Sequence, residues 1–351
     1  MKNLIKDSVR SIVPYSPNKN SYKIRLDANE NPFNMLAEMH DEIVGVIGEM
    51  EMNRYPDTDS FCLRQDLAKY VGLKQENIIC GNGSDEIIQV IIQTFVDKGD
   101  FVVTHVPTFS MYNIFTKIAG GEMIEVPSEE DFTVDVEKII DTANQSKAKV
   151  IFLCNPNNPT GTTMSSKDIL EVLQRTESMV VVDEAYYEFF GETMVSYVND
   201  WDRLIVLRTL SKAFGLADIR LGYGVAGEDT IEILNRVRPP YNLSTFSQAM
   251  GSLALRNVDR VENYIQSIKA ERIYMLNALQ EEKEIIAFPS EGNFVLVKSD
   301  KLKEIADSCY EKEIGTRIFR NDSMLQNCMR ISIGTRSEND CMIETIRKVV
   351  G

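Results

Sequence analysis

The stretch VIFLCNPNNPTG at residues 150–161 decides the fold of this chain. Its first five residues are all apolar, which is typical of a strand that is covered on both faces of a sheet. A polar loop follows at once, and its two prolines and glycine make it rigid. Similar β-rich runs lie on both sides, with amphipathic helical patterns between several of them. These runs span residues 101–106, 122–126, 179–182, 204–207 and 222–226.

This alternation predicts an open, doubly wound α/β sheet, in which ligands bind where the strands end. Residues 244–280 follow a continuous helical pattern without proline, which indicates one long helix or two joined end to end. After Pro289 the β pattern returns at 293–297, 317–319 and 329–333.

We therefore expect an α/β fold with a large, mostly parallel-sheet α/β/α domain and a smaller α+β domain. The expected bounds are 1–34 for an N-terminal arm that joins the small domain, 35–245 for the large domain, 246–280 for an interdomain helix and 281–351 for the small C-terminal domain.

Composition excludes several classes of function. With 43% hydrophobic and 26% charged residues, the chain of 351 residues is an ordinary globular protein with a sizeable core. Its formal net charge of -15 argues against nucleic acid or an anionic membrane surface as the main partner. No stretch approaches the roughly twenty apolar residues that span a bilayer. The six cysteines form no CxxC pair, and only two histidines accompany them, which predicts reduced thiols, no metal site and a cytoplasmic location.

Four loops that follow the predicted strands carry candidate chemistry. The first, Gly81–Asp85, comes just before a helix, where glycines and amide groups suit a phosphate. Taken alone, such a loop is more often an ordinary helix N-cap. In the second loop, Asn158 is placed to donate to a bound oxygen, although a stiff turn is the simpler explanation. In the third, Asp183 directly follows apolar Met179–Val182, so it needs a partner such as a protonated ring nitrogen or an arginine.

The fourth loop contains Lys212, five residues after Leu207 at the carboxyl edge of the sheet. A lysine there can be desolvated and its pKa lowered, as Schiff-base chemistry requires, whereas a lone surface lysine would simply be solvated. Ser211 and Arg220 flank it and could bind one phosphate. Together the loops offer a phosphate cradle, a donor to a phenolate oxygen, an acid for a pyridine nitrogen and an amine for an aldehyde. These match the four groups of pyridoxal 5′-phosphate.

Three motifs carry a resemblance to the fold-type I aminotransferases: Asn-Pro-Thr-Gly at 158–161, Asp-Glu-Ala-Tyr at 183–186 and Ser-Lys-Ala-Phe-Gly-Leu at 211–216. More narrowly, the chain resembles the histidinol-phosphate aminotransferase family, a class II subgroup. This second resemblance rests on the stretches 27–32, 54–57, 81–86, 107–109, 238–242 and 330–335, which occur in the family's order.

The resemblance implies pyridoxal phosphate as cofactor and transamination between L-histidinol phosphate and 2-oxoglutarate, which gives imidazole-acetol phosphate and L-glutamate in histidine biosynthesis. A threonine-phosphate decarboxylase and an aromatic amino-acid aminotransferase share the fold and remain open. A non-catalytic ligand sensor is disfavoured because the reactive lysine and its surrounding residues are all present.

The resemblance also implies roles for residues. The catalytic set is Lys212, which binds the aldehyde and later acts as base, Asp183, which pairs with the pyridinium nitrogen, and Tyr186, which with Asn158 bonds the ring oxygen. Phe109 would stack on the ring. The phosphate would be held by Ser84, Asp85, Ser211, Arg220 and, from a partner subunit, Tyr55.

Substrate binding is implied for four further residues. Arg330 would bind a carboxylate or, with Arg320, the phosphate of the amine donor, and Tyr15 and Asn29 match positions near the substrate. The expected active unit is a homodimer with shared active sites that acts on small molecules. One departure from the family pattern is Asp218, where glycine is common.

Overall fold

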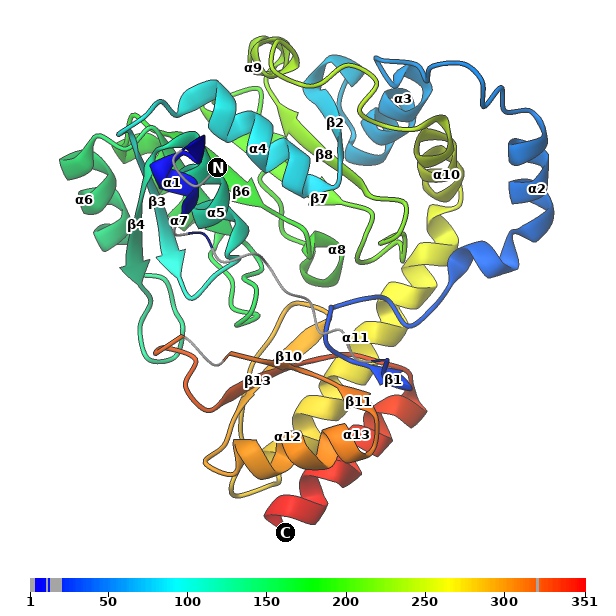
Figure 1. Ribbon diagram of the computed structural model, residues 1–351, viewed down its shortest axis with the longest axis vertical. Coiled ribbons are helices and arrows are strands. Elements are labelled where there is room, and N and C mark those ends of the chain that lie inside the picture. Colours follow the sequence, from blue (N-terminus) through cyan, green and yellow to red (C-terminus); the bar gives the residue numbers. More distant parts are fainter. Residues whose placement is uncertain (1–3, 11, 13–20, 320–321) are drawn as a thin grey trace.

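The computed structural model describes residues 4–10, 12, 21–319 and 322–351. Figure 1 shows a larger upper part built on one sheet and a smaller lower part built on another, with a long helix beside both. Short helical segments lie near the N-terminus and between the main elements: α1 (Asp7–Arg10), η2 (Met35–Glu38), α2 (His40–Gly48), η3 (Gln75–Asn77), α8 (Tyr187–Phe190) and η4 (Val195–Tyr197).

The upper sheet has seven strands in the order β2-β8-β7-β6-β5-β3-β4. Strand β8 runs antiparallel to both neighbours, and the remaining pairs are parallel. The strands are β2 (Ile78–Asn82), β3 (Phe101–Val106), β4 (Glu122–Pro127), β5 (Val150–Cys154), β6 (Met179–Asp183), β7 (Leu204–Thr209) and β8 (Leu221–Ala226). The prediction of a large, mostly parallel α/β sheet is confirmed. Strand β2 was not predicted, because Cys80, Gly81 and Asn82 interrupt its apolar run.

Both faces of the upper sheet are covered, which explains the continuous apolar runs. Alternate residues of β5 show this directly: Phe152 packs in the cluster on one face, whereas Leu153 packs in the cluster on the other. One face is covered by α4 (Ser84–Phe95), α5 (Met111–Ala119) and α9 (Glu228–Asn235), and the other mainly by α6 (Val136–Ser146) and α7 (Ser166–Arg175).

Two helices occupy the stretch for which one long helix or two joined helices were predicted. They are α10 (Thr245–Leu255), which packs on α3 (Phe61–Val71), and α11 (Val258–Gln280). Figure 1 shows α11 running from the upper part down along the lower part.

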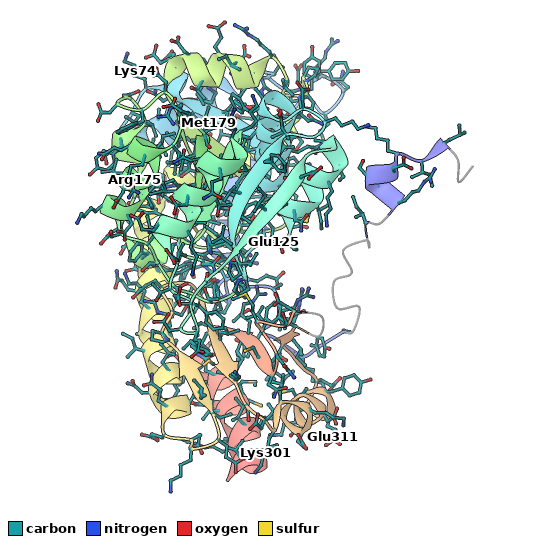
Figure 2. The ribbon with its side chains drawn as sticks, turned by 90° about the vertical axis from the view of Figure 1, so that its left-hand side faces the viewer. Lys74, Glu125, Arg175, Met179, Lys301 and Glu311 are labelled. Atoms are coloured by element: carbon teal, nitrogen blue, oxygen red, sulfur yellow. The ribbon has the colours of Figure 1, made fainter. Side chains whose placement is uncertain are left out.

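The lower part is an antiparallel sheet in the order β12-β13-β10-β9, with α11 against β9 and β10 and with α12 and α13 packed on each other. Figure 2 shows it from the side, with Lys301 and Glu311 near its lower end. Its elements are β9 (Ile286–Phe288), β10 (Phe294–Lys298), α12 (Leu302–Glu311), β12 (Arg317–Ile318), β13 (Cys328–Ser332) and α13 (Arg336–Val350). Near the N-terminus, β1 (Ile24–Arg25) pairs in parallel with β11 (Ile314–Gly315), which attaches these two residues to the lower part, whereas α1 contacts α5 of the upper part.

Within the described residues, no helix is both long enough and apolar enough to cross a membrane.

Candidate active site

A deep inner cavity lies where β5, β6 and β7 end at one edge of the upper sheet. Because parallel neighbours bring their carboxyl ends together, the loops that follow them converge there. All the predicted cofactor-binding residues except Tyr55 line this cavity. The lining is Ser84, Asp85, Phe109, Cys154, Asn158, Asp183, Ala185, Tyr186, Thr209, Ser211, Lys212 and Arg220.

The amine of Lys212 is held at the mouth of this cavity. Its Nζ donates to the carbonyl oxygen of Ala28 at 3.1 Å. Burial, assisted by the positive charge of Arg330, lowers the pKa of Lys212 from its ordinary 10.5 to about 8. A useful fraction of this amine is therefore neutral and nucleophilic near neutral pH, as the predicted Schiff-base role requires.

Asp183 lies deeper, at the end of β6, and is only 3% exposed. Its Oδ2 accepts a hydrogen bond of 2.6 Å from the hydroxyl of Tyr112, and its Oδ1 accepts one of 3.1 Å from the amide of Ala185. Burial raises the pKa of Asp183 to about 6, although both hydrogen bonds oppose this rise. A buried carboxylate that lines a cavity is suited to a cationic ring nitrogen. Tyr112 was not identified from the sequence.

Two further donors, Tyr186 and Asn158, line the cavity. The hydroxyl of Tyr186 accepts from Nδ2 of Asn29 at 2.9 Å, which leaves its own proton to donate into the cavity. Burial raises the pKa of Tyr186, so that proton is retained. The side-chain oxygen of Asn158 accepts from Nη1 of Arg330 at 2.6 Å, which orients the amide group of Asn158.

An anion cradle is formed where α4 begins. The N-cap residue is Gly83, with a φ of 78°, so no side chain covers the first amides of the helix. A Cβ on Gly222 would overlap the backbone of Ser84, so only glycine lets β8 approach this turn. The guanidinium of Arg220 lies 3.4 Å from Asp85 at the same place.

Ser211 completes the cradle from the loop after β7. The hydroxyl of Thr209 donates to Oγ of Ser211 at 3.0 Å and accepts from the Ser211 amide at 3.1 Å. An anion cradle, a buried carboxylate, two donors and a low-pKa amine around one cavity fit the phosphate, ring nitrogen, phenolate oxygen and aldehyde of pyridoxal phosphate. Asp218, the departure from the family pattern, is exposed and lines no part of this cavity.

A larger outer cavity of about 830 Å³ adjoins the inner one and shares Phe109, Asn158, Tyr186 and Lys212 with it. Arg330 of β13 and Arg317 of β12 both line it. The two arginines are direct partners in the antiparallel register, so their side chains leave the same face of the sheet. Arg317 was not predicted as a site residue, because the register of two short strands cannot be derived from their sequences.

The other predicted substrate residues are placed as follows. Asn29 lines the outer cavity. Tyr15 and Arg320 lie outside the described residues. Tyr55, the predicted contribution of a partner subunit, is 81% exposed, lines neither cavity and stacks on Tyr241.

The fold and the site define a pyridoxal-phosphate-dependent enzyme of fold type I. The family model for aminotransferase class I and II matches residues 21–346. A solved structure with the same fold is histidinol-phosphate aminotransferase from Sinorhizobium meliloti in complex with pyridoxal-5′-phosphate. It has a TM-score of 0.91 and 25% identity, with 99% of this chain and 97% of that chain covered.

Proteins of similar sequence identify the family within this class of enzymes. The histidinol-phosphate aminotransferase of Ruminiclostridium cellulolyticum is 41% identical, covering 99% of this chain and 98% of that protein. The enzyme of the same name from Thermococcus gammatolerans is 36% identical, and the match covers 99% of this chain and 98% of that protein. The chain belongs to the histidinol-phosphate aminotransferase family. The L-threonine-O-3-phosphate decarboxylase of Porphyromonas gingivalis, at 22% identity and a TM-score of 0.81, shares the fold alone.

Proposed function

We propose that this chain exchanges an amino group between L-histidinol phosphate and 2-oxoglutarate, and so acts in histidine biosynthesis. The observation that carries the proposal is the pairing of Arg317 with Arg330 on one wall of the cavity that Lys212 enters. Two guanidinium groups there suit a phosphorylated amine in one half-reaction and a dicarboxylate in the other. The family relationship supports the same choice of substrates.

Different residues of the chain would have different roles in this reaction. Pyridoxal phosphate, when bound, supplies an aldehyde for the amine and a ring that withdraws electrons from the reacting carbon. Lys212 would hold the aldehyde, and its amine, when free, would take the proton from the carbon that carries the amino group. Asp183 would keep the ring nitrogen protonated. Tyr186 and Asn158 would donate to the ring oxygen, and Phe109 would cover one face of the ring.

The anions at the two ends of the site would be bound separately. Ser84, Asp85 (through backbone amides), Ser211 and Arg220 would hold the phosphate of the cofactor at the start of α4. Arg330 and Arg317 would hold the substrate's phosphate or carboxylate at the wall of the outer cavity. Asn29 would lie beside the substrate, and its side-chain amide would orient the Tyr186 hydroxyl through their hydrogen bond.

We further propose a homodimer with shared sites. The surface formed by α2, α3, α10 and the loops before α3 and α10 exposes large apolar side chains, which is typical of an interface. They are Val44, Met52, Tyr55, Phe61, Tyr241 and Phe246. Tyr55 would cross this interface to the partner's phosphate cradle. A cytoplasmic location belongs to the same proposal and is supported by six cysteines without a disulfide.

A donor screen tests this function. Purified protein loaded with cofactor should form glutamate from 2-oxoglutarate most rapidly with L-histidinol phosphate. Aromatic amino acids should be poorer donors, and threonine phosphate should release no carbon dioxide. Rapid carbon dioxide release from threonine phosphate, or a clear preference for an aromatic amino acid, would replace the proposed function with the corresponding alternative.

A further inference from the structure

The hydroxyl of Tyr112 touches a catalytic side chain, although Tyr112 itself lines no part of the inner cavity. We propose that Tyr112 is a positioning residue, which holds the Asp183 carboxylate ionised and aimed at the ring nitrogen of the cofactor. The inference rests on the proposed role of Asp183 and does not depend on which amine donor the enzyme uses.

Packing fixes the Tyr112 side chain in place. The residue lies in the first turn of α5 and is fully buried. Its ring stacks on Phe152 of β5, with centroids 4.6 Å apart and planes 7° apart. It also forms an edge-to-face pair with Phe109, with centroids 5.6 Å apart and planes 82° apart. Because two rings hold it from different sides, the hydroxyl cannot turn away from Asp183 without disturbing the core.

The direction of this hydrogen bond is also fixed. Burial, and then the negative charge of Asp183, raise the pKa of Tyr112 well above 10, so the phenol keeps its proton. Tyr112 is therefore the donor and Oδ2 of Asp183 the acceptor. The amide of Ala185 donates to Oδ1, so both carboxylate oxygens have a protein donor. A neutral, protonated carboxyl would lose at least part of this arrangement, which therefore favours the ionised form.

The ionised form needs this support because the surroundings of Asp183 oppose it. Burial raises the pKa of Asp183 to about 6, and the negative charges of Asp85 and Glu184 add to the rise. Cys154 and Tyr186 also face this carboxylate and remain neutral, because burial raises the pKa of each. Among the groups that lower the pKa of Asp183, the Tyr112 hydroxyl has the largest effect.

Tyr112 also connects two contacts that the cofactor ring would make. The same side chain bonds the carboxylate that would meet the ring nitrogen and packs against Phe109, which would cover the ring face. One residue outside the cavity would thus support both side chains that hold the ring. This explains why a polar tyrosine occupies a position that phenylalanine could fill by size alone.

The test compares Tyr112→Phe with Tyr274→Phe in the cofactor-loaded enzyme. Tyr274 is a matched control, because its hydroxyl donates to Asp340 at the same distance of 2.6 Å but far from the site. Thermal unfolding first establishes that both variants are folded. We then measure the visible absorption of the bound cofactor against pH, the rate of cofactor release, and kcat and KM.

Tyr112→Phe should lower kcat by about tenfold, the value of one hydrogen bond to a charged group, and leave KM nearly unchanged. The pH at which the cofactor spectrum changes on the acid side should move upward, because Asp183 accepts a proton more readily without this donor. Cofactor release should be faster. Tyr274→Phe should match the wild type in all four measurements.

A double variant separates positioning from packing. In an Asp183→Asn background, Tyr112→Phe should have little further effect on kcat or on cofactor release, because the two residues act through one contact. Effects that simply add in the double variant would overturn the proposal, as would a Tyr112→Phe spectrum with the pH dependence of the wild type. Because spectrum and release need no amine donor, failure here is distinct from failure of the donor screen.

Discussion

The inner and outer cavities meet at Lys212 but are assembled in different ways. The inner cavity is lined by the ends of strands in one sheet and by the start of α4, within residues 84–220. The outer cavity adds residues 27–29 near the N-terminus and the strands β12 and β13 near the C-terminus. Side chains of the inner cavity are largely supported by neighbouring strands and turns. Those of the outer cavity depend on contacts between segments about 300 residues apart in sequence.

This difference separates cofactor chemistry from substrate choice. Asp183 and Ser211 are fixed by local hydrogen bonds and burial, so the inner cavity is organised before any substrate arrives. Arg330 instead bridges the two regions, because it donates to Asn158 of the large sheet and to the carbonyl of Asp27. Substitutions in the inner cavity should therefore affect all substrates alike, whereas those in the outer cavity should discriminate between them.

The largest effect should come from Lys212, one of the four residues that the two cavities share. Lys212→Ala removes both the amine that holds the aldehyde and the base, so transamination should fall by at least about 10⁴-fold with every donor. Steady-state assays with histidinol phosphate and with glutamate measure this, and circular dichroism checks the fold. Retention of a tenth of the activity would contradict the assignment of the base.

A smaller but uniform loss should follow from Asp183→Asn. The amide keeps the size of the side chain but cannot stabilise a proton on the ring nitrogen, so kcat should fall by about 10²–10³-fold for both half-reactions. The melting temperature should change little, because a buried carboxylate is replaced by a neutral group. A selective loss with one substrate would place Asp183 in substrate binding instead.

A selective effect should follow from changes in the outer cavity. Arg317→Ala should raise KM for the phosphorylated amine by about 10–100-fold and affect glutamate less, because a phosphate carries more charge than a carboxylate. Arg320→Ala provides the comparison, since Arg320 was the residue expected from the sequence to assist Arg330. A larger selective loss in Arg320→Ala than in Arg317→Ala would transfer the phosphate contact to Arg320.

The sequence predicts those parts of the fold and the site that depend on residues close together in the chain, and it misses those that depend on distant ones. The runs at 150–154 and 101–106 match β5 and β3 residue for residue, because a buried strand must be apolar wherever it pairs. Asn158 and Asp183 were also predicted, since each follows a predicted strand, whereas Cys154, Ala185 and Thr209 line the inner cavity without having been predicted as site residues. The facing of Arg317 and Arg330, and the contact between Tyr112 and Asp183, depend on register and packing that no local pattern encodes.

A moderate loss of kcat should follow from a substitution of Asn29, which contacts both regions. Its side-chain amide donates to Tyr186, and its backbone amide donates to Ser332 of β13. In Asn29→Asp a carboxylate would accept the Tyr186 proton and turn it away from the cavity, so kcat should fall by about tenfold. Stopped-flow measurement of each half-reaction would show whether both are slowed. If only the binding of one substrate weakens, Asn29 belongs to the outer cavity alone.

The smallest effect concerns the pKa of Lys212. With a pKa of about 8, roughly a tenth of this amine is neutral at pH 7. After the cofactor is removed, the rate of its recapture should therefore rise with pH and level off above about pH 8. Arg330→Ala removes a positive charge that lowers this pKa, so the rise should move to higher pH. An unmoved profile would show that the two cavities are electrostatically independent.

One measurement tests the central claim, that Lys212 captures the aldehyde at the junction of the two cavities. The cofactor-loaded protein is reduced with borohydride, digested, and its peptides are mapped by mass spectrometry. We expect the reduced cofactor on Lys212 alone, with no adduct in Lys212→Ala treated in the same way. An adduct on a different lysine, or an adduct that persists in the alanine variant, would contradict the account.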